Sequence, residues 1–337
     1  MTSLKRDKEF MSMALALARR GLGRTSPNPA VGCVIVKKSK VLATGFHKKA
    51  GFPHAEIEAI RLHGAKLKGA TLYVNLEPCC HLGRTPPCTD AIIRSGIREV
   101  IVGMKDPDPK VSGRGLRILR KAGIKVRTGV LQKECEELNE AYLVHRSQRR
   151  PFVILKMAMT LDGKVGRRDR QVRISGREAI QFGHQLRNEV DAILVGRGTV
   201  LNDNPRLTTR LEGKKGKNPI RIVLDSKLKL SPKARVFRMP GETIVVTAKK
   251  GRVDLKDLLK KLAERGIVSL LVEGGAEIWG SFLREKLVDR VILLLSPRIL
   301  RDGISAPLGQ LFSKIQGFKS QKIGSDLLIE INPQPEV

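Results

Sequence analysis

Short apolar runs alternate with amphipathic helical segments along most of this chain, and a turn signal separates each from the next. This alternation constrains the fold strongly, because strands followed by helices build α/β sheets. In the first half, the pattern predicts helices over residues 9–21, 55–63, 89–95 and 115–121, a hairpin of residues 30–36 and 40–45, and strands over residues 70–75, 100–103 and 125–128. Continuous apolar strands are typical of parallel sheets that helices cover on both faces. We therefore predict a largely parallel, covered sheet in this half.

A second series of the same kind follows a basic segment that ends in proline. This segment, VHRSQRRP at residues 144–151, is the predicted boundary between a domain at residues 1–146 and a domain at residues 151–337. After it, strands are predicted over residues 152–157, 192–196, 220–225, 243–248, 269–273 and 290–295, and helices over residues 177–188, 255–265 and 277–286. The length of 337 residues suits two ordinary domains.

The composition excludes several classes of protein. Hydrophobic residues make up 41% of the chain and charged residues 29%, which is typical of a packed core and excludes disorder and collagen. No run approaches the roughly 18–20 apolar residues of a membrane-spanning helix, so we expect no membrane association. The N-terminal sequence MTSLKRDKEFMSMALALARRG is an amphipathic pattern and not a secretory signal, so we expect a cytoplasmic protein. Three of the five cysteines fall within residues 79–88, which favours metal ligation over disulfides.

The net charge of +31 would attract phosphate groups of any kind. A basic nucleic-acid-binding protein that holds a structural zinc ion therefore remains an alternative. The basic residues are scattered along the whole chain, however, and aromatic residues, which stack on single strands, make up only 4% of it. We expect no specific nucleic-acid binding and interpret the charge as a lysine-rich surface.

One group of residues carries metal chemistry. His54 and Glu56 lie in the sequence Pro-His-Ala-Glu, and Cys79 and Cys88 each follow a proline. One imidazole and two thiolates are zinc ligands, and three protein ligands leave a fourth position for water, as in catalytic zinc sites. Zinc activates water near neutral pH, and Glu56 would shuttle protons from it to a leaving amine. Residues two apart point about 200° apart on a regular helix, so His54 and Glu56 share a site only at a helix start.

Taken in order, these residues resemble the zinc-dependent base-deaminase signature, H-x-E followed by P-C-x-x-C. The two cysteines here are nine residues apart instead of three, with HLGRTPP inserted. We interpret Cys80 as a bystander, because neighbouring residues rarely point at one ion. A structural zinc site would require a fourth protein ligand, for which His81 is the only nearby candidate.

Longer motifs resemble those of the bifunctional riboflavin-biosynthesis deaminase/reductase family. In the first half they are TSPNPAVGCVIV, GFPHAE and EPCCHLGRTPPC, and in the second half TLDGKV, VDAILVGRGTVLNDNPRLTTR and LVEGGAEIWGSFL. The resemblance covers nearly the whole chain. It implies a cytidine-deaminase-like three-layer domain followed by a dihydrofolate-reductase-like domain.

The resemblance also implies two successive reactions on a phosphoribosylated pyrimidine. The first domain would use Zn²⁺ to deaminate 2,5-diamino-6-(5-phosphoribosylamino)pyrimidin-4-one, and the second would use NADPH to reduce the ribosyl group of the product to ribityl. By resemblance, Asn28, His47 and Arg84 contact the first substrate. Arg84 suits a phosphate, or is an exposed cation. We also expect a homo-oligomer.

The second domain carries no G-x-G-x-x-G, so no Rossmann dinucleotide site is predicted. Instead, Gly274 and Gly275 precede a helix whose amides are suited to a cofactor phosphate, although a simple packing turn is the alternative. By resemblance, Asp203 lies in or beside the chemistry. The resemblance implies substrate contacts at Arg187, Leu207, Arg210 and Glu273, and NADPH contacts at Ala158, Thr199, Asp203, Ser226, Gly275, Ala276, Glu277, Ile278, Trp279, Gly280 and Ser281. Arg210 and Glu273 also have plainer interpretations, as a surface charge and a strand-end carboxylate.

Three positions depart from the family pattern. Asp108 stands where many relatives carry Asn, and Gln171 and Arg173 stand where relatives carry Ser and Trp. We therefore expect altered contacts with substrate or cofactor at these positions. A deaminase that edits RNA is the alternative function, to which the positive charge lends support. Such an enzyme would not need the second α/β domain.

Overall fold

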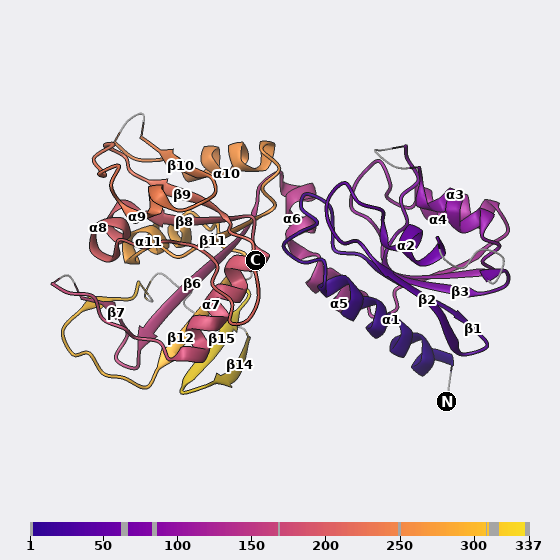
Figure 1. The fold of residues 1–337 in the computed structure, drawn as a ribbon, viewed down its shortest axis with the longest axis horizontal. Helices are drawn as coiled ribbons and strands as arrows, with labels where there is room; N and C mark the ends of the chain where they lie inside the picture. The colour runs from indigo at the N-terminus through magenta and orange to yellow at the C-terminus, as the bar shows by residue number, and fades with distance from the viewer. Residues whose placement is uncertain are drawn as a thin grey trace. The chain divides into compact units, whose positions relative to one another are not determined.

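The structure is a computed structural model, which describes residues 3–61, 67–82, 86–167, 169–248, 251–307, 309 and 317–333. The chain divides into two compact units, residues 1–149 and residues 150–337. Each unit contains a sheet with helices around it, which confirms the predicted two-domain α/β fold (Figure 1). No helix within the described ranges combines the length and the apolar composition of a membrane span.

The first unit is built on a five-stranded sheet with the order β2-β1-β3-β4-β5. These strands are β1 (Gly32–Lys37), β2 (Lys40–Phe46), β3 (Thr71–Leu76), β4 (Glu99–Met104) and β5 (Lys125–Thr128). β1 pairs antiparallel with both β2 and β3, whereas β3, β4 and β5 run parallel. The predicted hairpin is confirmed. The expectation of a largely parallel sheet holds for β3, β4 and β5, whereas the hairpin inserts β1 beside β3 in the opposite direction.

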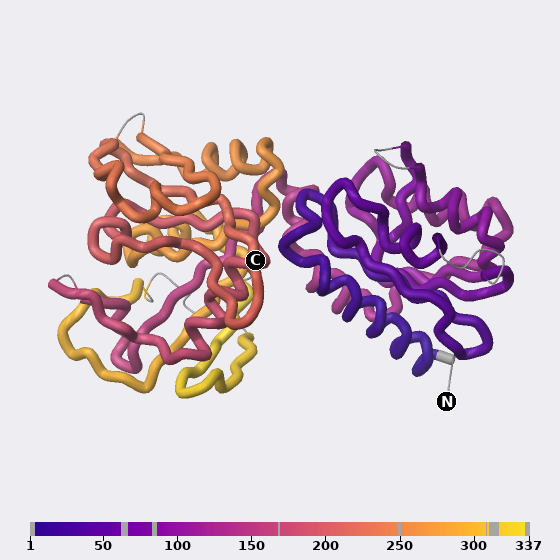
Figure 2. The backbone as a smooth tube through the Cα atoms, in the orientation of Figure 1, coloured from indigo at the N-terminus to yellow at the C-terminus, as the bar shows by residue number. Residues whose placement is uncertain are grey.

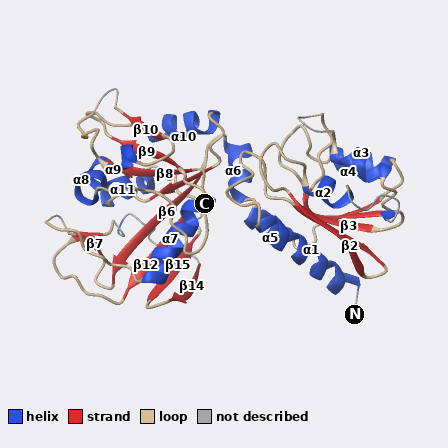
Figure 3. Ribbon diagram, in the orientation of Figure 1, coloured by secondary structure: helices blue, strands red, loops and turns tan. Residues whose placement is uncertain are grey.

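Helices cover both faces of this sheet and produce three layers (Figure 3). They are α1 (Ser3–Arg19), α2 (Ala55–Ile60), α3 (Cys88–Arg94), α4 (Arg114–Lys121) and α5 (Gln132–Leu138). α1 and α5 share one core with Val34 of β1, and α2, α3 and α4 share another core with its neighbour Ile35. Successive side chains of a strand point to opposite faces, so β1 contributes to both cores.

The helices of this unit differ from the predictions in their bounds, and two of the described helices were not predicted. α1 spans Ser3–Arg19 and not residues 9–21. The predicted helix over residues 55–63 ends at Ile60, and residues 62 and 63 lie outside the described residues. α5 and the following α6 (Glu140–Gln148) were not predicted, because QKECEEL and EAYLVHRSQ contain few apolar residues at helical spacing.

The second unit contains an eight-stranded sheet with the order β10-β9-β8-β11-β6-β12-β15-β14. Its strands are β6 (Phe152–Thr160), β8 (Ala192–Gly196), β9 (Ile220–Leu224), β10 (Thr243–Val246), β11 (Ser269–Val272), β12 (Arg290–Ser296), β14 (Phe318–Ile323) and β15 (Asp326–Ile331). All six predicted strands are present and run parallel. β15 and β14 add an antiparallel edge that was not predicted; they form the yellow end of the trace in Figure 2.

Helices of the second unit pack on this sheet or connect its strands. They are α7 (Arg177–Glu189), α8 (Arg197–Asp203), α9 (Arg235–Arg238), α10 (Leu255–Glu264) and α11 (Ala276–Arg284). α10 and α11 share one large core with β6, β8, β9, β11 and β12. A small two-stranded sheet pairs β7 (Lys164–Gly166) with β13 (Ile304–Ser305). The predicted α7, α10 and α11 are present, whereas α8 and α9 were not predicted.

Candidate functional site

The three predicted metal ligands come from the ends of three elements of the first unit. His54 is the N-terminal cap residue of α2, in an extended backbone conformation, so it lies just before the regular helix. Cys79 follows β3 after two residues, and Cys88 is the first residue of α3. The amide of Cys88 donates a hydrogen bond to Cys79 Sγ at 3.4 Å. The start of α3 therefore holds both sulfur atoms together.

The geometry of the ligand atoms fits a zinc ion. The atoms of His54, Cys79 and Cys88 lie within 4.8 Å of one another, and His54 Nδ1 is 3.5 Å from Cys79 Sγ and 3.3 Å from Cys88 Sγ. Tetrahedral zinc, with Zn–S bonds of about 2.3 Å and Zn–N bonds of about 2.0 Å, separates sulfur and nitrogen ligands by about 3.5 Å. Hydrogen bonds, first from Cys88 and then from His54, lower the pKa of Cys79, which favours a thiolate. Within the described ranges, no fourth protein ligand joins this group.

Glu56 lies beside these ligands as the second residue of α2. Its side chain is buried, and burial, followed by the charge of Cys79, raises the pKa of Glu56 to about 7. A carboxyl group whose pKa lies near the working pH both accepts and returns protons efficiently. The helix start thus places a metal ligand and a proton-transfer group together.

His47 and Asn28 form a hydrogen-bonded pair next to the same ligands. His47 Nδ1 lies 3.1 Å from the Pro53 carbonyl, which only accepts, so Nδ1 carries the proton and Nε2 accepts from Asn28 Nδ2 at 3.3 Å. Burial lowers the pKa of His47 and favours this neutral form. The ring centroids of His47 and His54 are 5.2 Å apart. Two residues predicted to contact substrate therefore lie beside the metal ligands.

A cavity of about 380 Å³ opens onto this group. The predicted residues Asn28, His47, His54, Glu56 and Cys79 line it. Asp106, Tyr142 and Arg146 also line it, although no motif marked them, and so does Asp108. Tyr142 and Arg146 come from α6, whose position depends on tertiary packing. Arg84 lies outside the described residues.

A hydrogen-bond network supports the acidic wall of this cavity. Glu77 is buried and accepts hydrogen bonds from the backbone amides of Asp106, Gly113 and Leu116 at 2.9–3.3 Å. Asp106 accepts from the Tyr142 hydroxyl and from the Asp108 amide, both at 2.9 Å. Burial raises the pKa of Asp106. The loop after β4 is therefore tied to both α4 and α6.

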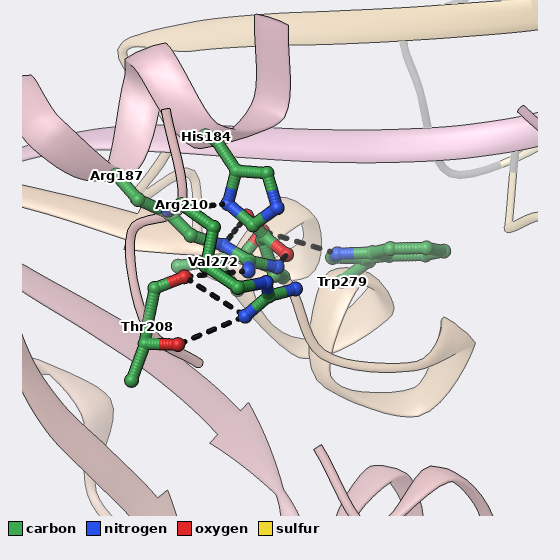
Figure 4. A network of polar contacts seen from close by, with 7 residues as sticks. His184, Arg187, Thr208, Arg210, Val272 and Trp279 are labelled. Atoms are coloured by element: carbon green, nitrogen blue, oxygen red, sulfur yellow. Dashed lines mark hydrogen bonds and ion pairs between the residues drawn. The ribbon is translucent and has the colours of Figure 1, made fainter. Parts of the chain in front are cut away.

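A second polar network lies in the second unit and brings together three residues predicted to contact substrate (Figure 4). Arg187 of α7 donates to both carboxylate oxygens of Glu273, at 3.0 and 2.6 Å, and Glu273 directly follows β11. Arg210 donates to Thr208 Oγ1 at 2.8 Å, and its amide donates to His184 Nδ1 at 3.4 Å. Leu207, adjacent to Thr208, is buried with a positive φ of 54°. Two guanidinium groups thus lie at the carboxyl end of a central strand.

The predicted glycine turn joins β11 to α11. A Cβ added to Gly274 would lie 3.0 Å from the backbone nitrogen of Gly196, so the close approach of β8 favours glycine here. The Gly275 amide donates to Thr199 Oγ1 at 3.1 Å, and Gly275 caps α11. Exposed backbone at a helix N-terminus is chemically suited to a cofactor phosphate. Trp279 and Gly280 of α11 are buried, and the Trp279 indole donates to the Val272 carbonyl at 3.4 Å.

The remaining predicted residues lie at several strand and helix ends of this unit. Asp203 ends α8 and is exposed, and Gln171 donates to its carbonyl at 2.8 Å. Ser226 follows β9 after one residue, and Ala158 lies within β6. The carbonyl of Arg173 accepts from Arg298 at 2.7 Å. Gln171 therefore contacts the backbone of a residue predicted to take part in the chemistry.

Comparisons with known proteins cover both units. Residues 4–104 match the cytidine and deoxycytidylate deaminase zinc-binding region, and residues 151–329 match the RibD C-terminal domain. The riboflavin biosynthesis protein RibD of Aquifex aeolicus is 43% identical, and the match covers 96% of this chain and 97% of the relative. RibD of Escherichia coli is 39% identical, with 87% and 88% covered.

Solved structures agree with these sequence matches. The crystal structure of a diaminohydroxyphosphoribosylaminopyrimidine deaminase/5-amino-6-(5-phosphoribosylamino)uracil reductase from Thermotoga maritima is 41% identical, with a TM-score of 0.89 over 99% of this chain and all of that one. RibD of Acinetobacter baumannii is 34% identical, with a TM-score of 0.90 over the same shares of the two chains. The chain therefore belongs to the RibD family of riboflavin-biosynthesis proteins, which join a deaminase and a reductase in one polypeptide.

Proposed function

We propose that this chain catalyses two successive steps of riboflavin biosynthesis. Residues 1–146 hydrolytically deaminate 2,5-diamino-6-(5-phosphoribosylamino)pyrimidin-4-one. Residues 151–337 then reduce the ribosyl group of the product, 5-amino-6-(5-phosphoribosylamino)uracil, to ribityl with NADPH. The observation that carries the proposal is the convergence of His54, Cys79 and Cys88 beside the buried Glu56 at one cavity.

In the deaminase, His54, Cys79 and Cys88 would hold Zn²⁺, which supplies Lewis-acid activation of water at neutral pH. Glu56 accepts a proton from the attacking water and returns it to the departing amine, which leaves as ammonia. Its buried side chain lies at the same cavity, directly beside the ligands, which suits both roles.

Substrate binding in the deaminase uses the polar groups beside the metal ligands. His47, fixed by the Pro53 carbonyl, orients the Asn28 amide toward the cavity that receives the pyrimidine. Arg84 is our candidate for the substrate phosphate, because a guanidinium binds phosphate oxygens through two parallel hydrogen bonds.

In the reductase, NADPH would lie against the glycine turn and supply the hydride. Thr199 Oγ1 and the open backbone at Gly275 favour a cofactor phosphate at the start of α11. We assign cofactor contacts to Ala158, Thr199, Asp203, Ser226 and residues 275–281, with Trp279 acting through its backbone. Asp203 would polarise the group being reduced. Arg187, Leu207, Arg210 and Glu273 would hold the substrate, with the two arginines toward its phosphate.

A coupled assay of the purified protein tests the whole proposal. With the diaminopyrimidine phosphate alone, the protein should release ammonia, and NADPH should be oxidised only once deaminated product is present. NADPH oxidation without prior ammonia release would contradict the order of the steps, and absence of both reactions would overturn the proposal. Single-stranded RNA serves as the competing substrate. The RNA-editing alternative is not favoured, because the family matches cover both units.

Compartment and assembly belong to the same proposal. The five cysteines are free thiols, and the zinc ligands among them need a reducing compartment, which supports the cytoplasm. We also propose a homo-oligomer that acts on a small molecule and binds no specific nucleic acid. Light scattering of the purified chain measures the assembly directly.

A further inference from the structure

The wall of the deaminase cavity is rich in carboxylates. Glu56, Glu77, Asp106 and Asp108 all line it. Among the described lining residues, Arg146 is the sole arginine or lysine. The substrate under the proposed function carries a phosphate, so uncompensated carboxylates on this wall would repel it. The position of Arg146 therefore matters for binding an anion.

Contacts within the first unit hold Arg146 against this wall. Its guanidinium carbon lies 5.3 Å from the ring centroid of Tyr142, one turn earlier on α6. Its Nη1 is 3.5 Å from Asp108 Oδ2, while Asp108 Oδ1 accepts the Lys110 amide at 3.0 Å. The Tyr142 hydroxyl is itself bound to Asp106. The Asp108 carboxylate is thus fixed by its own turn on one oxygen and faces a cation on the other.

Both side chains of this ion pair are partly exposed to solvent. The side chain of Asp108 is 13% exposed and that of Arg146 is 37% exposed. Charges at such sites interact more strongly than in bulk water, because the surrounding dielectric is lower. Asp108 lines the cavity and has Arg146 as its ion-pair partner, so removal of Arg146 would leave this carboxylate facing the substrate without a compensating charge.

We propose that Arg146 is a positioning residue of the deaminase: it holds the Asp108 carboxylate in place and cancels its charge, so that the cavity accepts a phosphate-bearing substrate. The proposal rests on the proposed function. It requires no contact between Arg146 and the reacting atoms, so the effect falls on KM and not on kcat.

The kinetics of ammonia release in variants that remove or keep these charges test this role in the full-length zinc-loaded protein. Arg146→Gln should raise KM about fivefold, the size of one partly exposed charge interaction, with kcat within about twofold. Arg146→Lys keeps the charge and should stay within about twofold of wild type in KM. Asp108→Asn combined with Arg146→Gln removes both charges and should recover most of the loss. The exposed Arg120 of α4 does not line the cavity, so Arg120→Gln is the matched control.

Two further measurements separate electrostatics from folding. The KM effect of Arg146→Gln should shrink in about 0.5 M salt and for the substrate that lacks its phosphate, because both changes weaken charge repulsion. An unchanged KM in Arg146→Gln, or an equal loss in the single and double variants, would overturn the proposal. If wild-type protein releases no ammonia, the proposed function itself fails, which distinguishes the two outcomes.

Discussion

At the residue scale, substitution of Glu56 should lower the deamination activity but, unlike substitution of a metal ligand, should leave the zinc content unchanged. Glu56→Gln keeps the shape of the side chain but cannot carry a proton, so deamination should fall by about 10²-fold or more. The zinc content should stay at the wild-type level, because Glu56 is not part of the ligand group. Ammonia release and metal analysis measure the two effects.

Glu58 provides the matched control for this variant, since it lies on the same helix and pairs with Lys48 at 2.7 Å. Glu58→Gln should deaminate within about twofold of wild type, because a surface ion pair contributes little. If Glu56→Gln retained a tenth of the activity or more, Glu56 would have no role in proton transfer.

His184 gives the second unit a defined sensitivity to acid. Burial, followed by the charges of Arg187 and Arg210, lowers the pKa of His184 from 6.5 to about 4, and Glu273 acts in the opposite direction. The unfolded chain therefore takes up a proton near pH 6.5, and the folded chain only near pH 4. The stability that depends on neutral His184 is complete above pH 6.5 and is lost as the pH falls toward 4.

Unfolding by urea at pH 7 and pH 5 checks this dependence. The single tryptophan, Trp279, is buried in the second unit, so its fluorescence follows that unit. Wild type should lose about 1–2 kcal/mol of unfolding free energy through His184 between the two pH values. His184→Gln should flatten this slope, and an equal slope in both proteins would contradict the assignment.

At the element scale, Gly45 of β2 allows α2 to reach its position. A Cβ at Gly45 would lie 2.2 Å from the Ala55 carbonyl oxygen and 2.7 Å from the Ala59 nitrogen. Both are backbone atoms, so Gly45→Ala must move α2, the helix that follows His54. We expect the variant to lose about 1–3 kcal/mol of stability and to bind zinc more weakly.

Calorimetry and zinc titration against a chromophoric chelator measure these effects. Gly183→Ala is the control, because Gly183 lies inside α7 with open space around it. It should stabilise the protein by about 0.5–1 kcal/mol, since alanine is the better helix former. Zinc binding in Gly45→Ala equal to wild type would show that α2 tolerates the shift.

Elements were predictable from sequence where the signal is local. His54 and Glu56 are two residues apart at the start of α2, and Cys88 opens the next helix, α3, so short local motifs revealed them. Tyr142 and Arg146 belong to a polar helix whose place at the cavity depends on a contact with Asp106, 36 residues earlier. No local pattern encodes that contact.

The missed edge strands have a related cause. β14 has the sequence FKSQKI and is almost wholly exposed, so it lacks the alternation that marks a half-buried strand. Its place in the sheet depends on backbone pairing with β15. Backbone hydrogen bonds are available to any residue except proline, so side chains give little sign of such a strand.

At the scale of the whole molecule, each unit has its own sheet and core, and the two proposed reactions use separate groups of residues. A chelator that removes zinc should therefore abolish deamination and destabilise the first unit, because ligand binding to the folded state stabilises it. NADPH-dependent reduction of the deaminated product, supplied directly, should persist.

The reciprocal change, Asp203→Asn, should impair only the reduction. Parallel assays of ammonia release and NADPH oxidation measure both steps. If chelation and Asp203→Asn each lowered the two activities equally, the assignment of one reaction to each unit would fail.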